Sequence, residues 1–277
     1  MPVQCDIPIG AIDDEEFRRT DFQVMGAAFE IHNDLGRLCP ESAYESQLAV
    51  RLRSVGRTVH RQVPFQVHYG TFRREYRLDL VVDRVPYELK SVAALDSTHR
   101  AQAINYASLL NVRLVKLINF GSGRVEGALV ARRSATADSS VRDVDLEWSP
   151  LSPGCVTLRS SLETFVDDVG LGCSLGLYTD YLVHMFGGAE ACTQSFELRT
   201  SGHRLGVQCF CLCAHNIAFS VTTHATASSE MANHFRRLVS LTELDALHWL
   251  NVGNTELSLV TVSPQQRSAS PPDRNSR

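Results

Sequence analysis

The stretch Tyr76–Lys90, YRLDLVVDRVPYELK, decides how the front half of this chain folds. It has the alternation of a β-hairpin that turns at Asp83–Arg84. Side chains along a strand point to alternate faces, so Glu88 and Lys90 share a face. The turn brings Asp79 close to Glu88 across the hairpin. A buried strand face is normally apolar, so three ionisable side chains on one face require an explanation.

A divalent metal ion would explain them. Two carboxylates held together repel each other, and burying both costs several kcal/mol unless something compensates. Mg²⁺ is typically held by one or two carboxylates, and its other positions go to water and substrate phosphate. A lysine beside such a site can orient or deprotonate the attacking water and support the developing phosphorane charge. Asp79, Glu88 and Lys90 therefore indicate metal-assisted phosphodiester hydrolysis. An ordinary ion pair on an exposed strand face is the alternative that these residues leave open.

The segment after the hairpin, residues 97–110, is predicted to be a helix that Ser97 or Thr98 caps. It carries Gln102 and Tyr106, which lie four residues apart and so share one helix face. Both side chains can point at the hairpin and contact a phosphate or a strand end. An amphipathic helix with a half-buried tyrosine is the alternative, and the nearby hairpin residues make it less attractive.

Hydrophobic periodicity predicts the other elements of the front half. Their order is helix, helix, three strands, helix, two strands, which indicates an α/β or α+β domain. The predicted helices are residues 17–36, 42–55 and 97–110, and the predicted strands are 62–69, 74–83, 85–91, 113–120 and 124–131.

Residues 24–121 resemble the GxxExxY proteins, a branch of the PD-(D/E)xK nuclease superfamily. The resemblance rests on GAAFEIHNDLG (26–36), ESAYESQL (41–48), YRLDLVVD (76–83), YELKSV (87–92), QAINY (102–106) and INFG (118–121), in this order. It implies a restriction-endonuclease-like fold, with a mixed central sheet flanked by helices. It also implies cleavage of DNA, sometimes RNA, that depends on Mg²⁺ or Mn²⁺.

The resemblance also assigns roles to single residues. It makes Asp79 and Glu88 metal ligands and Lys90 the catalytic lysine, and it matches Gln102 and Tyr106 to the Q-x-x-x-Y motif of the RecB-like branch. The residues that could add a further metal-binding carboxylate are Glu30 and Glu45, and those that could meet nucleic acid beside Gln102 are Arg77 and Arg100, together with Arg73, Arg74 and His99. These cations could equally form a solvated face.

The chain departs from the family pattern at two positions. Leu78 replaces the nominal proline before Asp79. The namesake Gly-x-x-Glu-x-x-Tyr begins with Leu38 in place of glycine, followed by Glu41 and Tyr44. The second departure puts the local turn in doubt, and neither affects the metal site.

The back half aligns with the front half at a nearly constant offset in residue number. An offset of 132 lays 114–130 on 246–262 and matches Asn119 with Asn251, and an offset of 134 matches Tyr44 with Tyr178. Identity is low, so chance alignment of similar patterns is the alternative to duplication. At the first offset, the catalytic positions fall on Cys211, Ser220, Thr222, His234 and Leu238, in place of Asp79, Glu88, Lys90, Gln102 and Tyr106.

These patterns predict four segments. They are a nuclease-like domain at 17–131, a linker at 132–153, a degenerate and non-catalytic copy at 154–263, and a disordered tail at 264–277. The second copy is expected to act as an internal pseudo-dimer partner, and a homodimer is the other arrangement considered.

Composition excludes several classes of protein. The net charge of −4 argues against a protein that coats nucleic acid. No stretch approaches the roughly 18 to 20 apolar residues of a membrane span, and the acidic N-terminus is unlike a secretory signal. The eight cysteines form no C-x-x-C pair, which favours reduced thiols and a cytoplasmic location.

The run Cys209–Cys213, CFCLC, is expected to place small buried thiols in a core strand. Three ligands at i, i+2 spacing on a flat strand would make a poor tetrahedral metal site. An iron–sulfur cluster would need a tighter spacing than the chain shows.

The sequence therefore predicts a metal-dependent phosphodiesterase that hydrolyses DNA. The alternative is a non-catalytic module that binds nucleic acid or protein on a nuclease-like fold. A different phosphoryl-transfer or Holliday-junction role on the same fold is a third reading, because fold does not fix function.

Overall fold

The computed structural model describes residues 3–10, 12–132, 142–144, 147–201, 203–224, 227–253 and 255–264. Its contacts divide the chain into two compact units. The first comprises Met1–Ser140 and Thr164–Tyr178, and the second comprises Val141–Glu163 and Thr179–Arg277. The predicted tail, apart from residue 264, lies outside the described residues, as do 133–141 and 145–146 of the predicted linker.

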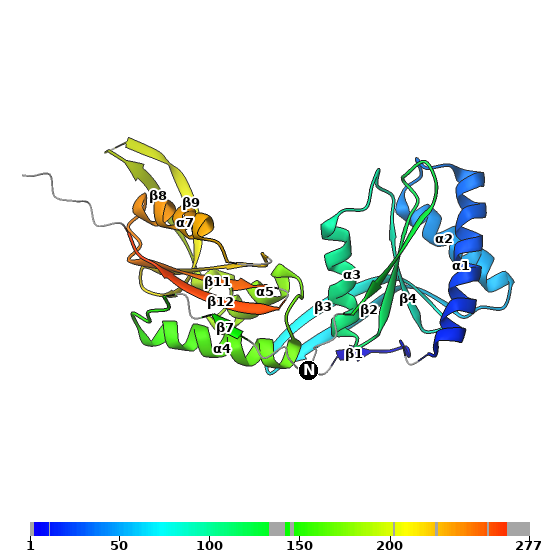
Figure 1. Cartoon of the computed structure of the whole chain (residues 1–277), viewed down its shortest axis with the longest axis horizontal. Helices are drawn as coiled ribbons and strands as arrows, with labels where there is room; N and C mark the ends of the chain where they lie inside the picture. The colour runs from blue at the N-terminus through cyan, green and yellow to red at the C-terminus, as the bar shows by residue number, and fades with distance from the viewer. Residues whose placement is uncertain are drawn as a thin grey trace, which may run out of the picture. The chain divides into compact units, whose positions relative to one another are not determined.

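The first unit is built on a six-stranded sheet in the order β1-β2-β3-β4-β5-β6. All neighbouring strands are antiparallel except β4 and β5, which are parallel and are therefore joined by a crossover helix, α3. Helices α1 and α2 cover one face of the sheet and α3 covers the other (Figure 1). The strands are β1 (Val3–Cys5), β2 (Val59–Tyr69), β3 (Phe72–Val82), β4 (Val85–Lys90), β5 (Leu114–Asn119) and β6 (Glu126–Ala131), and the helices are α1 (Asp14–Leu35), α2 (Glu41–Ser54) and α3 (Ser97–Leu109).

The hairpin of β3 and β4 turns where it was predicted. Asp83 and Arg84 have φ of 44° and 75°, the left-handed pair that a tight two-residue hairpin needs. The register sets Leu80 opposite Tyr87, and both pack into the core beneath α1 and α2. Because side chains along a strand point to alternate faces, Asp79 and the β4 side chains on the same face point toward α3.

Helix α1 packs one face against that core because its apolar residues recur at helical spacing. Asp13 caps its first turn by accepting a hydrogen bond from Glu16 N at 2.7 Å. Val24, Ala28 and Ile31 are fully buried on one face.

The second unit holds another six-stranded sheet, in the order β7-β12-β11-β10-β9-β8. Strands β10 and β11 are parallel, as β4 and β5 are, and the order of β8 to β12 repeats that of β2 to β6. This sheet is therefore consistent with a second copy of the fold. Its elements are β7 (Arg142–Val144), α6 (Ala189–Cys192), β8 (Thr193–Thr200), β9 (His203–Ala214), β10 (Ile217–Thr222), α7 (Ser229–Ser240), β11 (Ala246–Val252) and β12 (Glu256–Val262), and α4 (Pro153–Val169) and α5 (Leu175–Met185) run across the division between the units.

The parallel strands have the same register in both sheets. Glu88 pairs with Leu117 in the first sheet, and Ser220 pairs with Trp249 in the second, so both partners keep the offset of 132. In both sheets, an asparagine side chain also accepts a hydrogen bond from the loop that follows the central strand. Asn119 Oδ1 accepts a hydrogen bond from Val92 N, and at the same offset Asn251 Oδ1 accepts one from His224 N.

The corner between the first two helices is repeated as well. Tyr44 donates its hydroxyl proton to Gly36 O at 2.8 Å and accepts a hydrogen bond from Cys39 N at 3.1 Å. The residues that make the same two bonds at the offset of 134 are Gly170, Cys173 and Tyr178.

The second sheet has a β-bulge between β9 and β10 that the first sheet lacks at the corresponding place, besides a register shift between β8 and β9. Ala214 pairs with Ile217, but Leu212 pairs with Ala218, so Cys213 is an extra residue on β9. The register of β3 and β4 has no such shift over its paired residues.

The bulge corrects one pairing that the offset of 132 suggested. Since Phe219 pairs with Cys211, the register sets Phe210 opposite Ser220. Phe210, not Cys211, therefore occupies the position of Asp79.

Three local predictions were incomplete. Strand β1 was not predicted, and β7 lies inside the segment predicted as a linker, paired in parallel with β12. Asp96 caps α3, in place of Ser97 or Thr98, because its carboxylate accepts from Thr98 N and His99 N.

None of the helices in the described ranges combines the length and apolar character needed to cross a membrane.

Candidate active site

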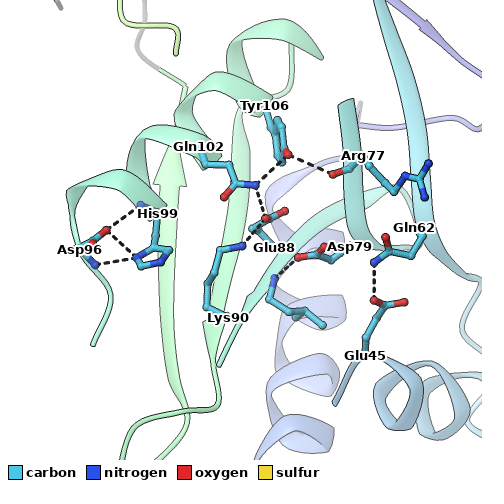
Figure 2. A network of polar contacts seen from close by, with 11 residues as sticks. Glu45, Gln62, Arg77, Asp79, Glu88, Lys90, Asp96, His99, Gln102 and Tyr106 are labelled. Atoms are coloured by element: carbon cyan, nitrogen blue, oxygen red, sulfur yellow. Dashed lines mark hydrogen bonds and ion pairs between the residues drawn. The ribbon is translucent and has the colours of Figure 1, made fainter. Parts of the chain in front are cut away.

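Glu88 lies at the centre of a polar group on the α3 face of the first sheet (Figure 2). Its side chain is almost fully buried, with 1% of the residue exposed. Its Oε1 accepts two hydrogen bonds of 2.6 Å, from Lys90 Nζ and from Gln102 Nε2. No donor among the described residues reaches Oε2, which is also buried. Burial and the neighbouring Asp79 raise the pKa of Glu88 to about 8, although Lys90 works against this shift.

Asp79 is anchored across the hairpin. Its Oδ2 accepts a hydrogen bond of 2.8 Å from Leu89 N, which fixes the carboxylate beside Glu88. Burial raises the pKa of Asp79, while the bond from Leu89 and the charge of Lys90 lower it in part. A buried carboxyl group beside a half-buried one, both with raised pKa values, is an arrangement that a bound cation would stabilise.

Lys90 is held at the end of β4 by its ion pair with Glu88. Burial alone would lower the pKa of Lys90, but the carboxyl groups of Glu88 and Asp79 raise it overall. The ammonium group is therefore charged and positioned beside both carboxylates.

Helix α3 aligns the group through Gln102 and Tyr106. Gln102 Nε2 donates one hydrogen to Glu88 and the other to Tyr106 Oη, at 3.0 Å. Tyr106 Oη donates in turn to Arg77 O at 3.2 Å. Burial and the charge of Glu88 raise the pKa of Tyr106 to about 12, so the phenol stays protonated. The two residues that were predicted to share a helix face thus form one chain of hydrogen bonds from β3 to Glu88.

Glu41, the first residue of α2, brings a third carboxylate to the group. Burial raises its pKa, Lys90 lowers it and Asp79 raises it, and Ser91 N donates a hydrogen bond to it. Sequence reasoning noted Glu41 only as part of the Glu-x-x-Tyr motif and gave it no role. The signal was present, because that motif begins the helix whose first residue lies beside β4.

Glu45 is engaged elsewhere although it is close enough to affect its neighbours. It is buried, and it accepts bonds of 2.5 Å from Arg61 Nε and 2.6 Å from Gln62 Nε2. Its charge contributes to the raised pKa values of Asp79 and Glu41.

Glu30 is not brought to this group. It is exposed on α1 and pairs with Arg51 at 3.1 Å, so it shares no contact with the buried carboxylates.

Of the cations predicted to meet nucleic acid, Arg73, Arg77 and Arg100 are exposed on β3 and α3, whereas Arg74 and His99 are half-buried. Arg77 is exposed and its guanidinium lies 3.4 Å from Glu75. Arg100 is exposed on the first turns of α3. His99 accepts a hydrogen bond from Asp96 N through its Nδ1, so it serves the helix cap.

The residues present fit a hard divalent cation. Glu88 Oε2 is buried and accepts no bond from the described residues, and the half-buried carboxyl groups of Asp79 and Glu41 have raised pKa values. A bound cation would neutralise the charge of these neighbouring acids.

The equivalent place in the second unit cannot hold such an ion. Trp249, at the position of Leu117, is buried there, and its Nε1 donates to Thr222 Oγ1 at 2.8 Å. Thr222 stands where Lys90 would be, and Phe210 packs in the same apolar cluster as Trp249. Apolar and aromatic side chains occupy this place in the second unit.

Residues 18–132 match the family model of the PD-(D/E)XK nuclease superfamily. No curated protein matches the chain in sequence. A solved structure titled "Crystal structure of SSO0001" resembles the chain at 13% identity and a TM-score of 0.27, over 44% of this chain and 61% of that one. The chain thus spans less than two thirds of that protein's length, and a likeness at this score does not bear on function.

Proposed function

Because residues 18–132 match the PD-(D/E)XK nuclease superfamily, we propose that the chain is a metal-dependent phosphodiesterase that hydrolyses DNA. The observation that carries the proposal is Glu88, a buried carboxylate with one oxygen held by Lys90 and Gln102 and the other left without a donor in the described structure.

Asp79 and Glu88, with Glu41 beside them, would hold Mg²⁺ or Mn²⁺. Such an ion polarises a phosphoryl oxygen and lowers the pKa of bound water. Lys90 keeps its ammonium next to the carboxylates and is in place to orient the attacking water and support the developing negative charge.

Gln102 and Tyr106 act as positioning residues in this proposal. They hold one oxygen of Glu88 and leave the other free for a ligand, and their own groups are occupied with each other and with Arg77 O. Arg77 and Arg100, exposed near the group, are the residues proposed to contact phosphates of the nucleic acid.

The test is cleavage of labelled single- and double-stranded DNA, and of RNA, by the full chain with Mg²⁺, Mn²⁺ or EDTA. Glu88→Ala and Lys90→Ala are expected to abolish cleavage. Glu15→Gln, which removes an exposed charge at the start of α1, is the matched control and is expected to cleave as the wild type does. Loss of activity in Glu15→Gln as well, or cleavage that persists in Glu88→Ala, would contradict the assignment.

Metal binding separates this proposal from a non-catalytic binding module. The wild type is expected to gain thermal stability with Mn²⁺, because a ligand that binds only the folded state stabilises it. Glu88→Ala is expected to show no such gain. Nucleic-acid binding without metal binding or cleavage would favour the module.

We also propose that the second unit is a non-catalytic copy of the first. The buried Trp249 and Phe210, at positions that correspond to the acidic group, support this proposal. The pseudo-dimer and homodimer arrangements stay predictions, and sedimentation of the full chain would distinguish a monomer from a dimer.

A further inference from the structure

A second group of metal-ligating side chains lies inside the second unit, away from any carboxylate pair. It consists of Cys155 on α4, Cys213 on β9 and His248 on β11. One ligand atom from each, the two sulfurs and a ring nitrogen, lies within 4.8 Å of both others, and all three residues are buried. A tetrahedral zinc ion with Zn–S bonds of about 2.3 Å would hold its sulfurs roughly 3.8 Å apart. The three side chains are thus within about 1 Å of a binding geometry.

Two backbone features bring the sulfurs together. Cys213 is the extra residue of the β-bulge, and bulges re-aim a side chain out of the regular alternation. Gly154 lets α4 approach β9 very closely, since a Cβ at this position would lie 2.0 Å from Cys213 O. The residue that follows it, Cys155, is thereby brought against the bulge.

The hydrogen bonds of His248 determine which of its ring nitrogens keeps a lone pair for a ligand. Its Nδ1 lies 3.1 Å from Thr261 Oγ1. That hydroxyl accepts from Ser149 N at 2.8 Å and donates its single proton to Ser149 O at 3.2 Å. Thr261 therefore accepts from Nδ1–H, and Nε2 is left with a lone pair. A metal-bound histidine is oriented in the same way, by a hydrogen bond to its other nitrogen.

Nε2 of His248 is the atom without a partner. It is buried and makes no hydrogen bond to any described residue. The Trp148 ring packs against the imidazole in a tilted arrangement, with 4.3 Å between the ring centroids. Burial lowers the pKa of His248 to about 4, so the imidazole is neutral. An unpaired nitrogen in such a place is costly unless something binds it.

The first unit uses the corresponding positions for a different polar link. Lys116 and Asp21, which align with His248 and Cys155 at the offsets of 132 and 134, form a buried ion pair of 2.9 Å. In each copy the first helix is thus tied to the second parallel strand by polar side chains. The second copy has neither a lysine nor an acid there, and it has two thiols and an imidazole instead.

We propose that Cys155, Cys213 and His248 bind one Zn²⁺ ion that ties α4 to the second sheet. Two thiolates and an imidazole suit zinc and are poor ligands for Mg²⁺, so this site is chemically distinct from the carboxylate site. The fourth position goes to water or to Ser152 Oγ, which lies 3.2 Å from Cys155 Sγ. Binding displaces the thiol protons, as it does in other zinc–thiolate sites.

The experiment is a Co²⁺ titration of the full chain, reduced and stripped of metal, followed by visible and near-ultraviolet absorption. Tetrahedral Co²⁺ with thiolate ligands gives strong d–d bands and a sulfur-to-cobalt charge-transfer band, which Co²⁺ on carboxylates lacks. The wild type is expected to develop both, to saturate at one thiolate-bound ion per chain, and to lose them when Zn²⁺ is added.

The variants make the test specific. The double variant Cys155→Ser/Cys213→Ser is expected to lose the charge-transfer band, Cys213→Ser alone to keep a weakened band from the remaining thiolate, and His248→Gln to weaken Co²⁺ binding by at least about tenfold. Cys209→Ser, an exposed cysteine on the same strand, and Glu88→Ala are expected to keep the band. Circular dichroism establishes that each variant is folded.

Two results would overturn the proposal. One is a folded, reduced wild type that shows no charge-transfer band at saturating Co²⁺. The other is a charge-transfer band that survives in a folded Cys155→Ser/Cys213→Ser protein, because the thiolate would then come from a cysteine outside the site.

Discussion

Lysine is rare in this chain, which makes its position informative. Of the 27 Lys and Arg residues, only Lys90 and Lys116 are lysines, and each lies in a buried ion pair. All the other residues of this set are arginines. A compact ammonium group fits beside Glu88 and Asp79 where a planar guanidinium would need more room and more acceptors.

Lys90→Arg is therefore expected to lower the rate of cleavage by about 100- to 1,000-fold, although it keeps the positive charge. Mn²⁺ affinity is expected to change much less than the rate, because the carboxylates stay in place. Single-turnover cleavage and calorimetric Mn²⁺ binding measure the two effects. Equal losses in rate and in affinity would mean that Lys90 serves only to hold the metal ligands.

The raised pKa of Glu88 has a consequence for stability in the metal-free protein. The folded protein keeps a proton up to about pH 8 that the unfolded chain releases near the ordinary glutamate pKa of 4.5. The folded state binds more protons between these values, so Glu88 lowers the free energy of unfolding as pH rises from about 4.5 to 8. Glutamine cannot ionise, so replacing Glu88 with glutamine removes this pH-dependent loss of stability.

Glu88→Gln is expected to match the wild type near pH 5 and to exceed it at pH 8.5 by on the order of 1–3 kcal/mol, in EDTA. Urea unfolding at the two pH values measures the difference. The same pH dependence in both proteins would show that Glu88 titrates normally. Added Mn²⁺ should reverse the order at pH 8.5, since only the wild type binds it.

At the scale of elements, local patterns predicted most of the first unit. Helical spacing and strand alternation placed three helices and five strands within a few residues, because each pattern is set by neighbours in sequence. The tight turn at Asp83–Arg84 and the shared face of Asp79 and Glu88 followed from the same local rules.

The features that the sequence did not predict depend on contacts between residues that lie far apart along the chain. Strand β1 has three residues and forms only because β2 offers an edge. The engagement of Glu45 by Arg61 and the bulge at Cys213 come from packing between elements that the sequence separates. The approach of Cys155 to His248 joins residues far apart along the chain, for which the sequence holds no local signal.

Two helix glycines have opposite roles, which gives a matched test. A Cβ at Gly154 would lie 2.0 Å from Cys213 O, whereas one at Gly26 in α1 would meet nothing within 4 Å. Gly154→Ala is expected to push α4 off β9 and cost about 1–3 kcal/mol. Gly26→Ala is expected to add about 0.5–1 kcal/mol, because alanine is the better helix former.

Thermal and urea unfolding of the two variants measure this difference. Gly154→Ala is also expected to weaken Co²⁺ binding at the proposed thiolate site, while Gly26→Ala leaves it unchanged. Equal stability in both variants would show that α4 does not depend on the close approach.

At the scale of the whole molecule, the two sheets share the order of five strands and the register of their parallel pair, but they differ in the side chains at the candidate site. Both keep the asparagine that holds the loop after the central strand, Asn119 and Asn251. The acidic group of one is apolar core in the other, where Phe210 and Trp249 fill the position. This difference is consistent with the proposal that the second unit is a non-catalytic copy.

The first unit also extends beyond the residues that match the nuclease superfamily. Residues 164–178 belong to it by their contacts. Phe165 is fully buried, with ring centroids 5.1 Å from Tyr69 on β2 and 6.2 Å from Phe72 on β3. Ser174 N donates to Asn105 Oδ1 on α3 at 3.0 Å. The far ends of β2 and β3 are therefore covered by chain that lies after residue 132.

Phe165→Ala is accordingly expected to destabilise the first unit by about 3–5 kcal/mol, the usual cost of emptying a buried phenylalanine site. Amide hydrogen exchange is expected to accelerate in β2 and β3, although both strands lie far earlier in the sequence. Val156→Ala, an exposed position on the same helix, is the control and should leave exchange unchanged. If Phe165→Ala accelerated exchange only in β8 to β12, residues 164–178 would belong to the second unit, and the first would end where the superfamily match ends.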